Sequence, residues 1–234
     1  MNTIRKQARF AGLLYLLLGV TAPIGLLYVP VKLIVRGDAA ATAENLRSSE
    51  SLLRLGIGSE LIHQALVIYV VLALYRLFKP VNVSLARHLV SLGALVSVPI
   101  MFVNVLNEVA ALTLAQGPEF LSVLDPLQRD ALAYLFMRLH GQGVVLASVF
   151  WGLWLFPFGL LVIRSGFIPK AFGYLLFAAG AGYLASSFAR LVVPPLVPLV
   201  DRLALPLQIA EVPILFWLAI WGARGPKASE PAAA

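Results

Sequence analysis

The 234-residue sequence contains no cysteine, and this absence excludes several classes of site. Disulfide bonds, thiolate metal ligands and cysteine nucleophiles all require that residue. Charged residues are also scarce: they make up 12% of the chain, about half their share in a typical soluble domain. Because hydrophobic residues reach 60% and the mean hydropathy is +0.90, the composition predicts a multi-pass membrane protein.

Motifs for nucleotide binding and serine hydrolysis are also missing in any usable context. Gly-x-Gly occurs at 56–58 and 180–182, but both copies fall inside apolar runs, where close helix packing explains them. The net charge of +7 does not indicate a nucleic-acid partner, because the basic residues lie in short turns and tails rather than on one helix face.

Apolar runs long enough to cross a bilayer recur along the chain, and they predict an all-α, polytopic membrane helical bundle. The first run follows Arg5, Lys6 and Arg9 and is too long for the apolar region of a signal peptide, so we expect it to be retained. The polar segment 36–54 is expected to form a loop with a short helix near Ala39–Arg47. One domain, 1–223, would hold all six transmembrane helices, followed by a short polar tail, 224–234. The predicted spans are 10–35, 55–78, 85–114, 137–163, 171–193 and 203–221.

The distribution of charge predicts that the N- and C-termini are both cytoplasmic. The tails and the turns after the second and fourth spans hold ten of the 18 Lys and Arg residues and one acid, Glu230. The segments on the other side hold acids and bases in near balance. This asymmetry matches the positive-inside rule.

Polar side chains nevertheless occur inside the spans, at helical spacing. Glu60, His63 and Gln64 stand at i, i+3 and i+4, and so share one helix face. In the third span Asn104, Asn107 and Glu108 repeat this spacing. Such groups are costly in lipid and are a default indication of function.

Three further spans carry polar groups toward the same outer half of the bilayer. The fourth has His140, the fifth has Arg190, which we expect to be a counter-ion to Glu108 or Glu211, and the sixth has Gln208 and Glu211. Five helices would then form one polar site. Its candidates for ligand binding or proton relay are Glu60, His63, Gln64, Asn104, Asn107, Glu108, His140, Arg190, Gln208 and Glu211.

This set of side chains is compatible with several functions. Carboxylates and imidazoles are ligands for a divalent metal such as Zn²⁺, Mn²⁺ or Fe²⁺, which favours a metal- or small-ligand-binding protein, and an intramembrane enzyme is one form of it. Haem between His63 and His140 ranks lower, because their expected depths differ. An excess of buried carboxylates over arginine equally suits a cation- or proton-coupled transporter. A structural or signalling protein, whose polar groups only join helices, is the third alternative. The metal candidates are Glu60, His63, Glu108, His140 and Glu211.

One long stretch resembles a known family. It runs from Phe156-Pro157-Phe158-Gly159 through Arg164-Ser165-Gly166-Phe167-Ile168-Pro169 to Leu176, and it occurs with Ala11-Gly12-Leu13-Leu14-Tyr15 and Tyr28-Val29-Pro30. Together these segments resemble the bacterial membrane family catalogued as domain of unknown function 4386. The resemblance implies a prokaryotic multi-pass membrane protein. We expect the bacterial inner membrane as its location, the lipid bilayer as a partner, and an unknown small ligand or ion at the polar site. The resemblance implies no activity, and it assigns no catalytic residue.

Overall fold

The computed structural model describes residues 3–224, and all regular elements in that range are helices. The expected tail 224–234 lies outside the described residues except for Arg224. Six helical segments are long and apolar enough to span a membrane, which confirms the predicted polytopic bundle. They are α1 (Thr3–Pro23) leading through a π-helical turn (Ile24–Tyr28) into α2 (Val29–Leu33); α4 (Glu50–Phe78); α5 (Val83–Val90) leading through a π-helical turn (Ser91–Val96) into α6 (Ser97–Gln116); α7 (Pro126–Ser165); α8 (Lys170–Val192); and α9 (Val197–Ile209) followed by α10 (Val212–Ile220).

The helices extend further than their apolar runs. The fourth span was expected to begin at 137, but α7 begins at Pro126 and has 40 residues. At 1.5 Å per residue it is about 60 Å long, roughly twice the thickness of the hydrocarbon core. A capping box explains the early start, because Asp125 accepts from Gln128 N and the Gln128 side chain accepts from Asp125 N. Hydropathy alone does not detect this start signal.

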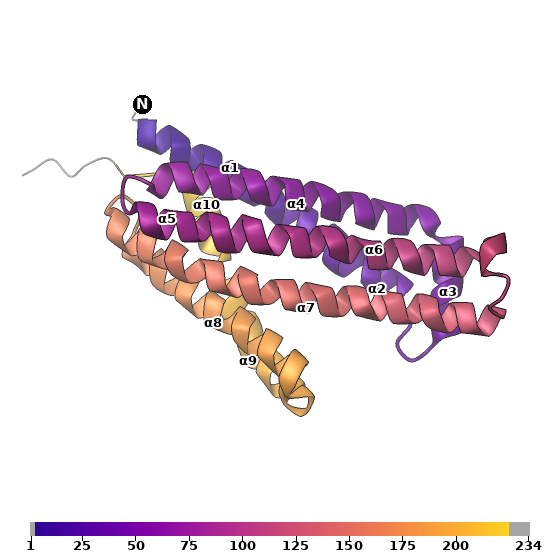
Figure 1. The fold of residues 1–234 in the computed structure, drawn as a ribbon. Coiled ribbons are helices and arrows are strands. Elements are labelled where there is room, and N and C mark those ends of the chain that lie inside the picture. The colour runs from indigo at the N-terminus through magenta and orange to yellow at the C-terminus, as the bar shows by residue number, and fades with distance from the viewer. Residues whose placement is uncertain (1–2, 225–234) are drawn as a thin grey trace, which may run out of the picture.

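The extra length builds a head at one end of the bundle. Figure 1 shows α4, α6 and α7 running together past the end of the shorter α8–α9 pair, with α3 (Ala39–Ser48) close to their tips. This confirms the short helix expected near Ala39–Arg47. We call α3 and the ends of α4, α6 and α7 that pack on it the distal head. Arg47 joins its helices by bonding Asp130 Oδ1 and Ala115 O, and the Asp130 bond raises the pKa of Arg47.

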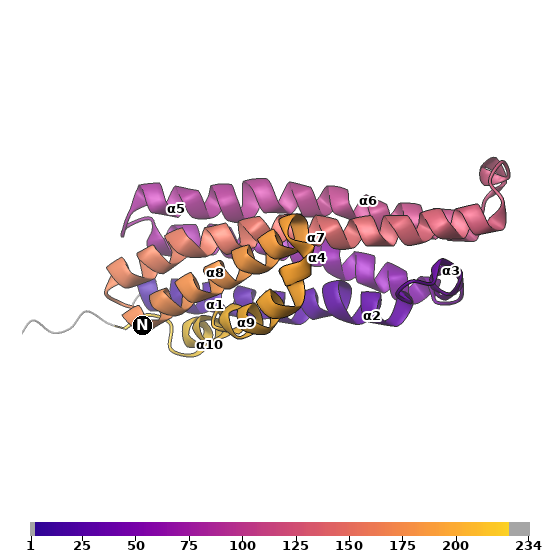
Figure 2. The ribbon, with the colours of Figure 1, turned by 90° about the horizontal axis from the view of Figure 1, so that it is seen from below.

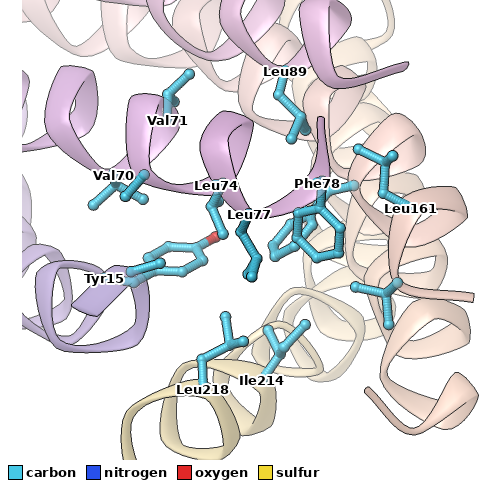
Figure 3. Close-up of a cluster of buried hydrophobic side chains, with 14 of the residues drawn as sticks. Tyr15, Val70, Val71, Leu74, Leu77, Phe78, Leu89, Leu161, Ile214 and Leu218 are labelled. Atoms are coloured by element: carbon cyan, nitrogen blue, oxygen red, sulfur yellow. The ribbon is translucent and has the colours of Figure 1, made fainter. Parts of the chain in front are cut away.

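The opposite half of the bundle holds the larger apolar core. Tyr15, Leu74, Phe78 and Leu218 are among the buried side chains that fill the space between α1, α4, α7, α8 and α10 (Figure 3). Helix α1 approaches α10 so closely that a Cβ on Gly12 would lie 2.2 Å from the Ala219 nitrogen. Small residues therefore set helix spacing here, as in other membrane bundles.

The sixth span is interrupted. It was expected to be one helix over 203–221, after a break at the prolines. Instead a short 3₁₀ turn at Pro194–Leu196 leads into α9, and the helix is broken again at Ala210–Glu211 before α10. Helix α9 packs on α8, whereas α10 packs on α1. Seen from below, α10 lies on the side of the bundle away from α5 and α6 (Figure 2).

Candidate functional site

The polar face of α4 is buried as predicted. Glu60 is 1% exposed, and His63 and Gln64 are also buried. Room for Glu60 comes from Gly25 in the first π-helical turn, where an added Cβ would lie 2.6 Å from Glu60 Cγ. The carboxylate is thus enclosed by α4 and the middle of the first span.

Helix α6 supplies the second carboxylate and an amide that bonds to α7. Glu108 is fully buried, and Asn104 lies one turn earlier. Asn104 Nδ2 donates to the backbone oxygen of His140, at 2.9 Å. The two helices meet where α7 has Gly143, since a Cβ there would lie 1.9 Å from Asn104 Oδ1. Asn107 Nδ2 in turn donates to Asn104 Oδ1 at 3.1 Å.

His140 of α7 completes the cluster. Its Nε2 lies 3.1 Å from Glu60 Oε2 and 4.0 Å from Glu108 Oε1. One ligand atom from each of the three residues lies within 4.8 Å of the other two. Glu60, Glu108 and His140 therefore form a buried triad drawn from three helices, and we use that name below.

The triad carries hydrogen-bonding capacity that the described residues leave unused. Glu60 Oε1, both Glu108 oxygens and the whole Gln64 amide are buried without a partner. Two carboxylates beside one imidazole leave net negative charge unless protons or a cation are bound. Buried charge of this kind is costly when it is uncompensated, so the triad requires a positively charged ligand or protonation.

The triad lies away from the end that carries the N-terminus. At 1.5 Å per residue, Glu60 is about 27 Å from the helix end at Phe78, and His140 is about 38 Å from the end at Ser165. A hydrocarbon core of about 30 Å that begins near these basic ends would reach its far boundary at the triad. The cluster thus stands where the spans pass into the distal head.

Two predicted members face elsewhere. His63 Nδ1 is 3.0 Å from Thr21 Oγ1 of α1, and Ser59 Oγ donates to Thr21 O. Glu211 accepts a hydrogen bond from the Tyr15 hydroxyl, with Tyr183 as a second neighbour. Within residues 3–224 the metal-ligand group comprises the triad and includes neither His63 nor Glu211. The two histidines have different partners, so the geometry gives haem no support.

Arg190 and Gln208 also lie apart from the triad. Arg190 was expected to neutralise Glu108 or Glu211, but its Nη2 pairs with Asp201 Oδ2 at 2.5 Å. The reason is the early start of α9, which brings Asp201 beside the end of α8. Gln208 Nε2 donates to Gly182 O and Ser186 Oγ across the α8–α9 contact. The expected single five-helix site is therefore replaced by separate polar groups.

Sequence reasoning did not assign a site role to Tyr15, Thr21, Gly25 or Gly143. The glycines carry the clearest signal in retrospect, because each stands on a helix that packs against a buried polar side chain. Tyr15 was visible within the Ala-Gly-Leu-Leu-Tyr segment. Its partnership with Glu211 depends on the interruption of the sixth span, which periodicity did not predict.

The chain was compared with known proteins. The family model for the Domain of unknown function (DUF4386) matches residues 10–222. The chain belongs to this family. An uncharacterised protein from Archaeoglobus fulgidus is 31% identical over 153 residues, which cover 65% of this chain and 75% of that relative. No solved structure matches the chain.

Proposed function

We propose that this DUF4386 protein binds a divalent metal ion at the triad. The observation that carries the proposal is the meeting of Glu60, Glu108 and His140 from three helices, with ligand atoms within 4.8 Å of one another. Three buried carboxylate oxygens in this cluster have no hydrogen-bond partner. A bound cation would supply both the missing contacts and the missing charge.

The distances fit such an ion. Bonds of about 2.0–2.2 Å to zinc hold neighbouring ligand atoms about 3–4 Å apart. His140 Nε2 already stands 3.1 Å from Glu60 Oε2 and 4.0 Å from Glu108 Oε1. The remaining pair, one ligand oxygen each from Glu60 and Glu108, lies within 4.8 Å. Two carboxylates and one imidazole suit zinc, manganese or iron in the divalent state.

Three protein ligands are typical of catalytic sites rather than structural ones, because a coordination position stays open. A metal ion in such a position lowers the pKa of a bound water and generates a nucleophile at neutral pH. The donor set therefore favours an intramembrane hydrolase over a structural metal site. Asn104 would act as a positioning residue, because its bond to the His140 backbone fixes α6 against α7 at this level.

A surface groove supports a substrate that resides in the membrane. It has a volume of about 460 Å³, runs along α6 and α7, and is lined by Pro99, Val103, Asn104 and Gly143 among others. The triad itself is closed, with exposures of 0 to 3%. The groove brings the lipid-facing surface next to Asn104, so an amphiphile with a hydrolysable polar group is the substrate class we infer.

Equilibrium dialysis of detergent-purified protein against Zn²⁺ and Mn²⁺ tests the metal site. We expect one ion per chain, with binding lost in Glu108→Gln and retained in Glu211→Gln. The two variants remove one carboxylate each, from different polar groups. Equal binding by both variants, or no saturable binding by the parent protein, would reject the proposal in favour of a structural or transport role.

We also propose that both termini face the cytoplasm, and that the membrane is the bacterial plasma membrane. The charge asymmetry supports this orientation. The absence of cysteine makes a direct test simple, because any introduced cysteine is unique. An impermeant maleimide added to intact cells should label Ser122→Cys, in the connection between α6 and α7, but not Ser165→Cys. The reverse pattern would invert the topology.

A further inference from the structure

The interruption of the sixth span places a carboxylate inside the membrane bundle, apart from the triad. Helix α9 ends at Ile209 and α10 begins at Val212, with Glu211 between them. Pro213 has no N–H to donate to the carbonyl of Ile209 four residues earlier, so the helix cannot continue normally. Irregular backbone in a membrane protein is tolerated where it lines a site or a cavity.

Hydroxyl groups, rather than cations, surround this carboxylate. The Tyr15 hydroxyl of α1 donates to Glu211 Oε1, and Tyr183 of α8 lies beside it. In residues 3–224 no lysine, arginine or histidine forms an ion pair with Glu211. Arg5 and Arg9 of α1 instead donate to the carbonyls of Trp221 and Ile220, at the far end of α10. Helix α10 contributes no titratable side chain of its own.

A line of polar groups runs from the exposed end of the α8–α9 pair to Gln208, three residues before Glu211. Asp201 is paired with Arg190, and their side chains are 32% and 45% exposed. Ser186 Oγ donates to Asp201 Oδ1 at 3.3 Å, and Gln208 Nε2 donates to Ser186 Oγ at 3.2 Å. Gln208 stands one helical turn before Glu211. The groups thus step from the surface, along the α8–α9 contact, toward the carboxylate.

We propose that Glu211 is a proton-binding site in the membrane, reached by water from the exposed end of α8 and α9 past the polar side chains of Asp201, Ser186 and Gln208. In this step a carboxylate oxygen of Glu211 gains one proton from a hydronium ion, which becomes water, and the carboxylate becomes a carboxylic acid. When the proton leaves, the Tyr15 hydroxyl donates to the ionised oxygen. No oxidant, metal or other co-reactant takes part. This site is independent of the metal site proposed for the triad.

Carbodiimide labelling tests the proton site directly, because dicyclohexylcarbodiimide enters lipid and reacts with protonated carboxyl groups. Mass spectrometry of the liposome-reconstituted protein should find the label on Glu211, with a yield that falls several-fold as pH rises. The exposed Glu119 serves as an internal reference for reagent access. Absence of label on Glu211 at every pH, or a yield that does not depend on pH, would overturn the proposal. Protection by Na⁺ at constant pH would also overturn it and assign a metal cation instead.

The supply path has its own test. Infrared spectroscopy in D₂O follows deuteration of the Glu211 acid, identified as the carbonyl band that Glu211→Gln removes. Ser186→Ala should slow this exchange several-fold. The control Ser165→Ala, at the other end of the bundle, should leave the rate unchanged. If Ser186→Ala exchanges as fast as the parent protein, the path is wrong. Unchanged intrinsic tryptophan fluorescence would establish that each variant is folded.

Discussion

The two halves of the bundle hold carboxylates in opposite chemical settings. In the α4–α6–α7 half, Glu60 and Glu108 share one imidazole and retain oxygens with no hydrogen-bond partner. In the α1–α8–α10 half, Glu211 is a single carboxylate that accepts a hydrogen bond from the Tyr15 hydroxyl. Two carboxylates that share one imidazole suit a divalent cation, whereas one carboxylate with hydroxyl donors can be served by a proton. The side chains around each carboxylate, rather than its residue type or its depth, therefore determine how the two sites differ.

The difference between the two settings is tested most strongly by truncating each of the two buried histidines, His63 and His140. His140→Ala removes a triad ligand, so we expect the affinity for Zn²⁺ to fall at least about 100-fold, more than loss of a supporting residue typically costs. His63→Ala should change affinity by less than about threefold, because His63 contacts Thr21. Isothermal titration calorimetry measures both. Equal losses would mean that one site spans both histidines.

Metal binding should stabilise the protein only while the triad is intact. An ion at 100 times its dissociation constant adds about 2.7 kcal/mol to the free energy of unfolding, which corresponds to a rise in Tm of about 5 °C or more. We expect this rise for the parent protein and for Glu211→Gln, but not for Glu108→Gln. Differential scanning fluorimetry follows it. A full rise in Glu108→Gln would place the stabilising ion elsewhere.

The α6–α7 contact can be altered without changing a ligand. A side chain at Gly143 meets Asn104, whereas one at Gly141 meets open space. Gly143→Val should destabilise the protein by about 1–3 kcal/mol, a typical cost of overpacking, and weaken Zn²⁺ binding about tenfold. Gly141→Val places the same side chain on the same helix and should do neither. The pair is compared by chemical denaturation and calorimetry, and similar behaviour of both variants would refute a positioning role for Asn104.

In the other half, Tyr15→Phe removes the hydroxyl bonded to Glu211. We expect the free energy of unfolding to fall by about 1–2 kcal/mol, because the partly buried Glu211 carboxylate loses its hydrogen-bond donor. The control is Tyr69→Phe on α4, because the Tyr69 side chain is 62% exposed. This variant should change the free energy of unfolding by no more than about 0.5 kcal/mol. Zn²⁺ affinity should not change in either variant. A change in Tyr15→Phe would show that the two halves are coupled.

The smallest expected effect belongs to the Arg190–Asp201 pair. Its side chains are partly exposed, and exposed ion pairs contribute about 0–1 kcal/mol. A double-mutant cycle with Arg190→Gln and Asp201→Asn should therefore give a coupling energy below about 1 kcal/mol. A larger coupling energy would mean that the Arg190–Asp201 ion pair stabilises the contact between the ends of α8 and α9.

Much of the triad was predictable from helical geometry. Glu60 and Glu108 were candidates because each lies inside an apolar run at a spacing that defines a face, and His140 because its expected depth matched theirs. The six spans were likewise predictable from apolar length. Sequence spacing does not show which neighbouring helix each polar face contacts, because that direction is set by packing between helices.

His63 and Glu211 illustrate this gap. Three residues turn a helix by about 300°, so His63 is offset by about 60° from Glu60. That offset is enough to direct one side chain to α1 and the other to α7. Glu211 was assigned to the same site because the sixth span was taken as one helix. The interruption at Ala210–Glu211 sends α10 onto α1 instead, and local hydrophobicity contains no signal of that packing.

A divalent ion at the triad is the proposal on which the metal-binding predictions depend. The most direct test is anomalous X-ray diffraction, at the zinc absorption edge, from crystals grown with Zn²⁺. We predict one anomalous peak within bonding distance of Glu60, Glu108 and His140, and no such peak at Glu211. A triad closed by hydrogen bonds alone, in a crystal whose zinc lies elsewhere, would contradict the account.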